Sequence, residues 1–358
     1  MEILAEISGL KYTPFSCSSL EVFDVSHLED ALSSPNFILK FNDENNIAVS
    51  RWVSPKRTRS YPYANVYDTL GFTGKKVTII PVIKDEGFDG DRDFLQWDTV
   101  SLMSLLGVYV VIGYYVHATK NPSYENKITD QRFDVQHIRS ELNELLSYQS
   151  DALHWNLSRI DKISTIAEAA LNSYDALSRS LGIKMHSRES ALKRIAKLSE
   201  GRASFMGLSR QLAKKAQKRE SVTNQPKERL EGEKAIITIK NYLGGNYYFT
   251  CDEVELHGNE VYLIEGKHTE TGSLPHEGDI KDGLLKMVLF TNLVRVTIDG
   301  REYKPVPVLK LTTGSRHLSL NEAQETALKE LKKDAQTNSF RIKINDEFIK
   351  LDETLFDE

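Results

Sequence analysis

Two carboxylates and a lysine are closely spaced in the C-terminal third of the chain. Glu265 and Lys267 are two residues apart at the end of the apolar run 261–264, and Asp252 lies thirteen residues before Glu265. Residues two apart on a β-strand project to the same face, and the two strands of a hairpin lie roughly 5 Å apart. The spacing therefore predicts that Asp252, Glu265 and Lys267 meet at one edge of a sheet.

Such a group of side chains suits phosphodiester hydrolysis. Paired carboxylates bind a hard divalent cation such as Mg²⁺. The cation polarises the scissile phosphate and lowers the pKa of a bound water. A lysine beside the attacking water orients it and offsets the charge that develops on phosphorus.

The elements that must position these side chains follow from the surrounding pattern. Residues 249–256 and 261–264 are strand-like runs, and the turn residues 257–260 between them predict a hairpin. Residues 279–293 have helical spacing, and residues 294–311 hold two further strand candidates around Asp299 and Gly300. The expected order is hairpin, helix, strand.

Asp252, the hairpin, Glu265-x-Lys267 and the following amphipathic helix resemble the D…(D/E)XK core of the PD-(D/E)XK nuclease superfamily, over roughly residues 234–311. The resemblance implies a mixed sheet flanked by helices, with Asp252 and Glu265 as Mg²⁺ ligands and Lys267 as the catalytic lysine. The proline that names the motif is absent, because Cys251 precedes Asp252. Glu253 and Glu255 are therefore alternatives for the first carboxylate.

Many type II restriction endonucleases belong to this superfamily. The resemblance accordingly implies a Mg²⁺-dependent endonuclease that cuts double-stranded DNA, in the manner of a restriction enzyme, as a homodimer. Two other functions are open on the sequence alone. One is a repair or defence nuclease that recognises nucleic-acid structure or RNA, and the other is a non-catalytic DNA-binding scaffold protein.

Two loops of the N-terminal third also concentrate chemistry. Residues 54–63 combine Lys56, Arg57 and Arg59 with two tyrosines, which suits contacts with phosphates and bases. We expect this loop to contact DNA. Residues 84–93 include five acidic side chains, of which Asp91 and Asp93 offer a competing metal site.

The charge of the chain is unevenly distributed. The formal net charge is −5, but between residues 184 and 219 eleven basic residues face only two acidic ones, which leaves that segment at +9. Lys214 and Lys215 lie in it. A concentrated basic segment predicts sequence-independent phosphate contacts and strongly salt-dependent DNA binding.

Length and pattern together predict an α/β protein with three regions. Residues 1–133 alternate strand-like and helical runs, as expected for an α/β domain. Residues 134–225 form a helical region with a basic face, and residues 226–358 form the nuclease core. Neither glycine nor proline occurs between residues 134 and 181, where apolar residues recur every three or four positions. This spacing predicts one long amphipathic helix or an antiparallel pair, with a dimer-forming coiled coil as the alternative.

Several classes of protein have no support in the sequence. Two cysteines are too few for a disulfide framework or a thiolate metal site. The phosphate-binding, dinucleotide-binding, serine-hydrolase and zinc-protease motifs are absent. The N-terminus lacks the features of a secretory signal, and no apolar run is long enough to span a bilayer. We expect a cytoplasmic protein without a membrane partner.

Overall fold

The computed structural model describes the chain except for residues 57–60, 200–232, 242–245, 316–317 and 352–358. The chain divides into two compact units. One, here called the α/β unit, is Ser19–Leu212, and the other, here called the barrel unit, combines Met1–Ser18 with Ala213–Glu358. Both units contain helices and sheets, so the mixed α/β class expected from the sequence is confirmed.

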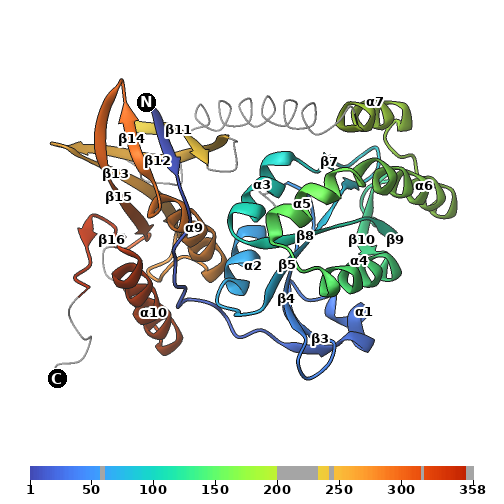
Figure 1. Ribbon diagram of the computed structural model, residues 1–358, viewed down its shortest axis with the longest axis horizontal. Helices are drawn as coiled ribbons and strands as arrows, with labels where there is room; N and C mark the ends of the chain where they lie inside the picture. The colour runs from blue at the N-terminus through green and yellow to red at the C-terminus, as the bar shows by residue number, and fades with distance from the viewer. Residues whose placement is uncertain (57–60, 200–232, 242–245, 316–317, 352–358) are drawn as a thin grey trace. The chain divides into compact units, whose positions relative to one another are not determined.

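A five-stranded mixed sheet forms the centre of the α/β unit (Figure 1). Its elements and their connections are β2 (Val22–Asp24), the 3-10 helix Val25–His27, α1 (Leu28–Ala31), β3 (Asn36–Lys40), β4 (Asn46–Arg51), α2 (Pro62–Thr69), β5 (Lys75–Pro81), α3 (Trp97–Leu105) and β8 (Val108–Gly113). The strand order is β2-β3-β4-β5-β8, and only the β3–β4 pair is antiparallel. The strand, helix and strand expected between residues 77 and 116 are confirmed as β5, α3 and β8. Two hairpins complete this part of the unit: β6 (Ile83–Asp85) with β7 (Arg92–Phe94), and β9 (Tyr115–Lys120) with β10 (Ile128–Phe133).

The stretch without glycine or proline folds into several helices instead of one. They are α4 (Val135–Ser147), α5 (Ala152–Ile160) and α6 (Ile163–Leu181), and α7 (Arg188–Ser199) follows. Aspartates mark two of the starts, because the carboxylates of Asp134 and Asp151 accept backbone N–H groups in the first turns of α4 and α5. The apolar stripe of α4 lies in the core of the same unit, where Leu142 and Leu145 are fully buried. It is therefore not available for a coiled coil with a second chain.

The barrel unit is built on a curved sheet that closes on itself. Its elements are β1 (Glu2–Ile7), β11 (Glu233–Asn241), β12 (Asn246–His257), β13 (Glu260–His268), α9 (Glu277–Phe290), β14 (Val294–Ile298), β15 (Arg301–Thr312), α10 (Glu322–Asn338), β16 (Arg341–Ile344) and β17 (Glu347–Phe348). The sheet order is β13-β12-β11-β1-β14-β15-β16-β17. An additional parallel pairing of β13 with β15 joins six of these strands into a barrel-like ring.

The expected hairpin, helix and strand are present in this unit. β12 and β13 pair across a turn in which Gly258 has a φ of +64°, a left-handed conformation that glycine adopts without strain. α9 follows β13, and β14 and β15 form the second hairpin around Asp299 and Gly300. The connection from β13 through α9 and β14 leads to β15, which runs parallel to β13.

The division into units differs from the three regions expected from the sequence. The helices after residue 134 share the core of the N-terminal sheet, so they are not a separate region. The first residues of the chain belong with the C-terminal part, because β1 pairs in parallel with β11 over all six of its residues. Hydrophobic periodicity gives the elements but not their long-range partners, which explains the difference.

Within the described part of the chain, no helix combines the length and the apolar character needed to cross a membrane.

Candidate active site

An irregularity in β12 positions Asp252. The pairing of β11 with β12 shifts between Ala235↔Cys251 and Glu233↔Val254, so β12 carries one residue more than β11 at this point. A β-bulge of this kind re-aims side chains and is frequent beside active sites. The ladder between β12 and β13 ends with Glu253↔Ile264, and the N–H of Gly266 donates to Asp252 Oδ2 at 3.0 Å. Asp252 thus lies directly beside Glu265 and Lys267, as the spacing predicts.

Glu265 is the buried centre of the site, with 1% of its side chain exposed. Lys267 Nζ is 2.9 Å from Glu265 Oε1, and Lys286 Nζ is 2.6 Å from Glu265 Oε2. Burial alone would raise the pKa of Glu265, but the charges of the two lysines outweigh it and lower that pKa to about 2. Glu265 is therefore held as a carboxylate between two ammonium groups.

The pKa of Asp252 shifts in the opposite direction from that of Glu265. Burial, together with the negative charge of Glu265, raises the pKa of Asp252 to about 7, although both lysines act to lower it. Two adjacent carboxylates that repel each other in this way are a donor set for a divalent cation. Mg²⁺ is commonly bound through one or two carboxylates together with substrate phosphates, so Asp252 and Glu265 fit that ion.

Helix α9 packs against β13 and β15. The packing is close at Gly283, because a Cβ there would lie 2.7 Å from Leu309 Cδ1 of β15 and 3.2 Å from Lys267 Cε of β13. Lys286 lies three residues further along the same helix and therefore on the same face. Its Nζ also donates to the carbonyl oxygen of Thr250 at 3.3 Å. The sequence places Lys286 on the amphipathic helix behind the sheet, where a supporting role in the site is open but most lysines are solvated.

The other acidic residues of β12 do not join the site. Glu253 pairs with Lys310 at 3.2 Å, and both side chains are buried, with 3% exposed. Glu255 contacts His257 at 2.9 Å and Lys343 at 3.8 Å. Of the three candidates for the first carboxylate, the geometry favours Asp252.

The residues expected to contact DNA are only partly described. Lys56 is exposed, and its backbone N–H donates to Ser54 Oγ at 3.2 Å. Arg57, Arg59, Lys214 and Lys215 lie outside the described residues.

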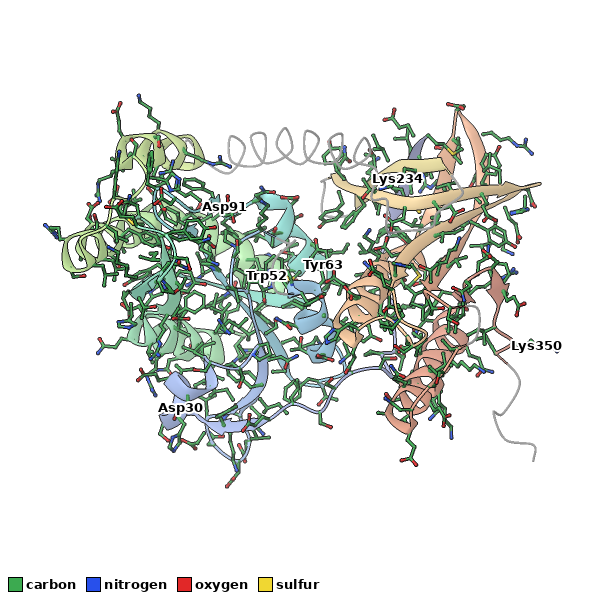
Figure 2. All side chains as sticks on the ribbon, turned by 180° about the vertical axis from the view of Figure 1, so that it is seen from behind. Asp30, Trp52, Tyr63, Asp91, Lys234 and Lys350 are labelled. Carbon is green, nitrogen blue, oxygen red and sulfur yellow. The ribbon has the colours of Figure 1, made fainter. Side chains whose placement is uncertain are left out.

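The 54–63 loop starts and ends beside buried aromatic residues. Trp52 and Tyr63 lie side by side, with ring centroids 6.0 Å apart (Figure 2). Tyr63 is only 6% exposed, so it is not presented for stacking on a base, whereas Tyr61 is 43% exposed.

Several acidic side chains of the loop 84–93 have partners within the α/β unit. Asp85 Oδ1 lies 2.8 Å from His186 Nδ1, and Glu86 pairs with Lys84 and Lys127 at 3.1 and 3.4 Å. Asp93 accepts a hydrogen bond from Ser54 Oγ at 2.9 Å. Across the described ranges, no cluster of three or more His, Cys, Asp or Glu side chains is placed to hold a metal ion. The competing metal site at Asp91 and Asp93 stays a prediction.

Comparison of the chain with family models, with curated proteins and with solved structures finds no match. The assignment of a function consequently depends on the geometry and chemistry of the site in the barrel unit.

Proposed function

We propose that this chain is a Mg²⁺-dependent endonuclease that hydrolyses phosphodiester bonds of double-stranded DNA at specific sites, in the manner of a type II restriction enzyme. One observation carries the proposal. Asp252, Glu265 and Lys267 meet at the bulge of β12, with Gly266 N–H on Asp252 and Lys267 Nζ on Glu265. The resemblance to the D…(D/E)XK core supports the same reading.

Asp252 and Glu265 would hold Mg²⁺, which polarises the scissile phosphate and lowers the pKa of a bound water. Glu265 remains anionic because Lys267 and Lys286 stabilise its charge. Lys267 retains its proton because the charge of Glu265 raises the Lys267 pKa despite burial. Its ammonium group then donates hydrogen bonds to the attacking water or to a phosphate oxygen. In this role Lys267 offsets the negative charge of the pentacoordinate phosphorus.

Affinity for the DNA backbone is assigned to the basic segment 184–219. The structure describes this segment up to residue 199, and some of its basic side chains contact other residues of the protein. Arg188 pairs with Asp175, and Arg194 lies over the ring of Phe94, 4.5 Å from its centroid. Lys184 and Lys193 are exposed, with Lys184 Nζ 4.2 Å from the centroid of the Phe88 ring and Lys193 paired with Glu189 at 2.7 Å. Lys56 and its neighbours are assigned to base contacts, and a homodimer would let two sites cut opposite strands of a palindrome.

Incubation of unmodified bacteriophage DNA with the purified protein and Mg²⁺ tests this function. Discrete fragments with a common sequence at their ends would support a sequence-specific endonuclease. Cutting confined to branched or single-stranded substrates would favour a structure-specific nuclease. DNA binding without cleavage in Mg²⁺ or Mn²⁺ would favour a scaffold protein and contradict the proposal.

A further inference from the structure

Lys286 places a second positive charge on Glu265, in addition to the lysine of the D…(D/E)XK pattern. Lys267 holds Glu265 Oε1, and Lys286 holds Glu265 Oε2 at 2.6 Å. Lys286 also donates to the Thr250 carbonyl at 3.3 Å, so it links α9 to β12 and β13 together. Only 16% of the Lys286 side chain is exposed. The ion pair is thus largely shielded from solvent.

A buried carboxylate needs a counter-charge. Removing one partner of a buried ion pair is strongly destabilising, because the remaining charge is left in a medium of low dielectric. A divalent cation bound by Asp252 and Glu265 would supply the counter-charge in place of a lysine, at the carboxylate oxygen atoms of Glu265. Two cations of this kind compete, since both are attracted to one carboxylate and repel each other.

Of the two lysines, we take Lys286 as the one that releases Glu265. Lys286 reaches the carboxylate from a neighbouring helix. The Thr250 carbonyl is already within its reach and remains as a partner when Oε2 is released. Lys267 lies on the same strand as Glu265, and its charge is further stabilised by Asp282.

We propose that Lys286 is an internal counter-ion, which occupies Glu265 until a divalent cation binds and then withdraws towards Thr250. This inference rests on the proposed function, because it requires a divalent cation at Asp252 and Glu265. Lys286 would keep the site folded and Glu265 oriented in the metal-free protein, and it would weaken metal binding in return.

Thermal unfolding of the full chain, first treated with chelator and then titrated with Mg²⁺ at constant pH, tests the proposal. The variants are Lys286→Met and, as the matched control, Lys310→Met, which breaks the buried pair with Glu253 outside the site. Without metal, each variant is expected to unfold about 5–10 °C below the wild type. Mg²⁺ should raise the unfolding temperature of Lys286→Met more than that of the wild type, with roughly tenfold tighter apparent affinity. For Lys310→Met the Mg²⁺-induced shift should equal that of the wild type.

Two results would overturn the inference in distinguishable ways. If the wild type responds to Mg²⁺ but Lys286→Met binds the ion no more tightly, Lys286 is not a competing counter-ion and the proposed function stands. If neither protein responds to Mg²⁺ or Mn²⁺, the metal site itself is contradicted, and the proposed function with it.

A second measurement, on the wild-type protein, tests the proposal if Lys286→Met does not fold. Acetylation of lysines, followed by mass spectrometry, reports how freely each ammonium group reacts. Mg²⁺ is expected to increase the modification of Lys286 several-fold while that of Lys310 stays constant. Constant modification of Lys286 under conditions where Mg²⁺ raises the unfolding temperature would overturn the proposal.

Discussion

Gly283 of α9 lies against Lys267 of β13, so closely that a Cβ at Gly283 would stand 3.2 Å from Lys267 Cε and 2.7 Å from Leu309 Cδ1. A Cβ at position 283 would displace the ends of the Leu309 and Lys267 side chains, so glycine lets the helix pack against the proposed catalytic lysine without moving it. Glycine within a helix costs roughly 1 kcal/mol relative to alanine. In this protein the glycine is accompanied by close packing of α9 against β13, and this packing helps to fix the position of Lys267.

Gly283→Ala is therefore expected to lower the cleavage rate by about tenfold, because a displacement of the catalytic group by a fraction of an ångström is costly. It should also fail to give the stabilisation that alanine normally brings to a helix. Rates and unfolding temperatures of both proteins check this. Gly9→Ala adds the same methyl group where nothing lies within 4 Å, and it should leave the cleavage rate unchanged. Full activity in Gly283→Ala would show that the contact does not position Lys267.

The buried pair of Glu253 and Lys310 should behave as a structural element. Lys310→Met alone is expected to lower the free energy of unfolding by about 3–5 kcal/mol, because it leaves Glu253 buried and uncompensated. The double variant Glu253→Leu, Lys310→Met should recover most of this loss, since buried ion pairs are often replaceable by apolar residues. Urea unfolding of the three proteins measures both effects. A double variant as unstable as the single one would contradict this account.

Glu144 gives a pH-dependent contribution to stability. Its hydrogen bond with Arg159 lowers the pKa of Glu144 from its ordinary value of 4.5 to about 2. The folded state thus binds the proton less readily than the unfolded state, so the stabilisation is complete above the unfolded pKa. It is lost as the pH falls from about 4.5 towards 2. Because 46% of the Glu144 side chain is exposed, solvent weakens the effect.

Glu144→Gln should accordingly reduce stability at pH 7 and make a smaller difference at pH 3. Urea midpoints of the wild type and the variant at the two pH values provide the comparison. The same loss at both pH values would indicate that the charge of Glu144 does not contribute.

DNA binding should depend steeply on salt if the segment 184–219 contacts phosphates. Lys184→Ala and Lys193→Ala are each expected to weaken binding equally for all sequences and to reduce the salt slope by about 1. Fluorescence anisotropy with Ca²⁺ in place of Mg²⁺, over a series of salt concentrations, measures the slope. An unchanged slope in both variants would place the phosphate contacts elsewhere.

The local part of the candidate site was predictable from the sequence. A turn between two apolar runs gives the β12–β13 hairpin, and the two-residue spacing of Glu265 and Lys267 gives their common face. The bulge at Asp252 and the contact of Lys286 with Glu265 were not predictable in this way. A bulge leaves no periodic signal, and Lys286 on an amphipathic helix has the pattern of a solvated residue.

The long-range part of the fold shows the same limit. β1 pairs with β11 although more than two hundred residues separate them, and β13 pairs with β15 to complete the ring. Neither pairing follows from local periodicity, because alternation fixes which face of a strand is buried and not which strand lies beside it. The breaks between α4, α5 and α6 contain neither glycine nor proline, so the sequence gives little sign of them. Asp151 caps the start of α5, whereas α6 starts without a side-chain cap.

The most direct test of the central claim is the cleavage rate of double-stranded DNA by Lys267→Ala, with DNA affinity measured in parallel in Ca²⁺. The matched control is Lys304→Ala, an exposed lysine of β15 that pairs with Glu260 at 3.1 Å. We predict that Lys267→Ala cleaves about 100- to 1000-fold more slowly than the wild type while it binds DNA with similar affinity. Lys304→Ala should cleave at the wild-type rate. Cleavage by Lys267→Ala at the wild-type rate would contradict the assignment of the active site to Asp252, Glu265 and Lys267.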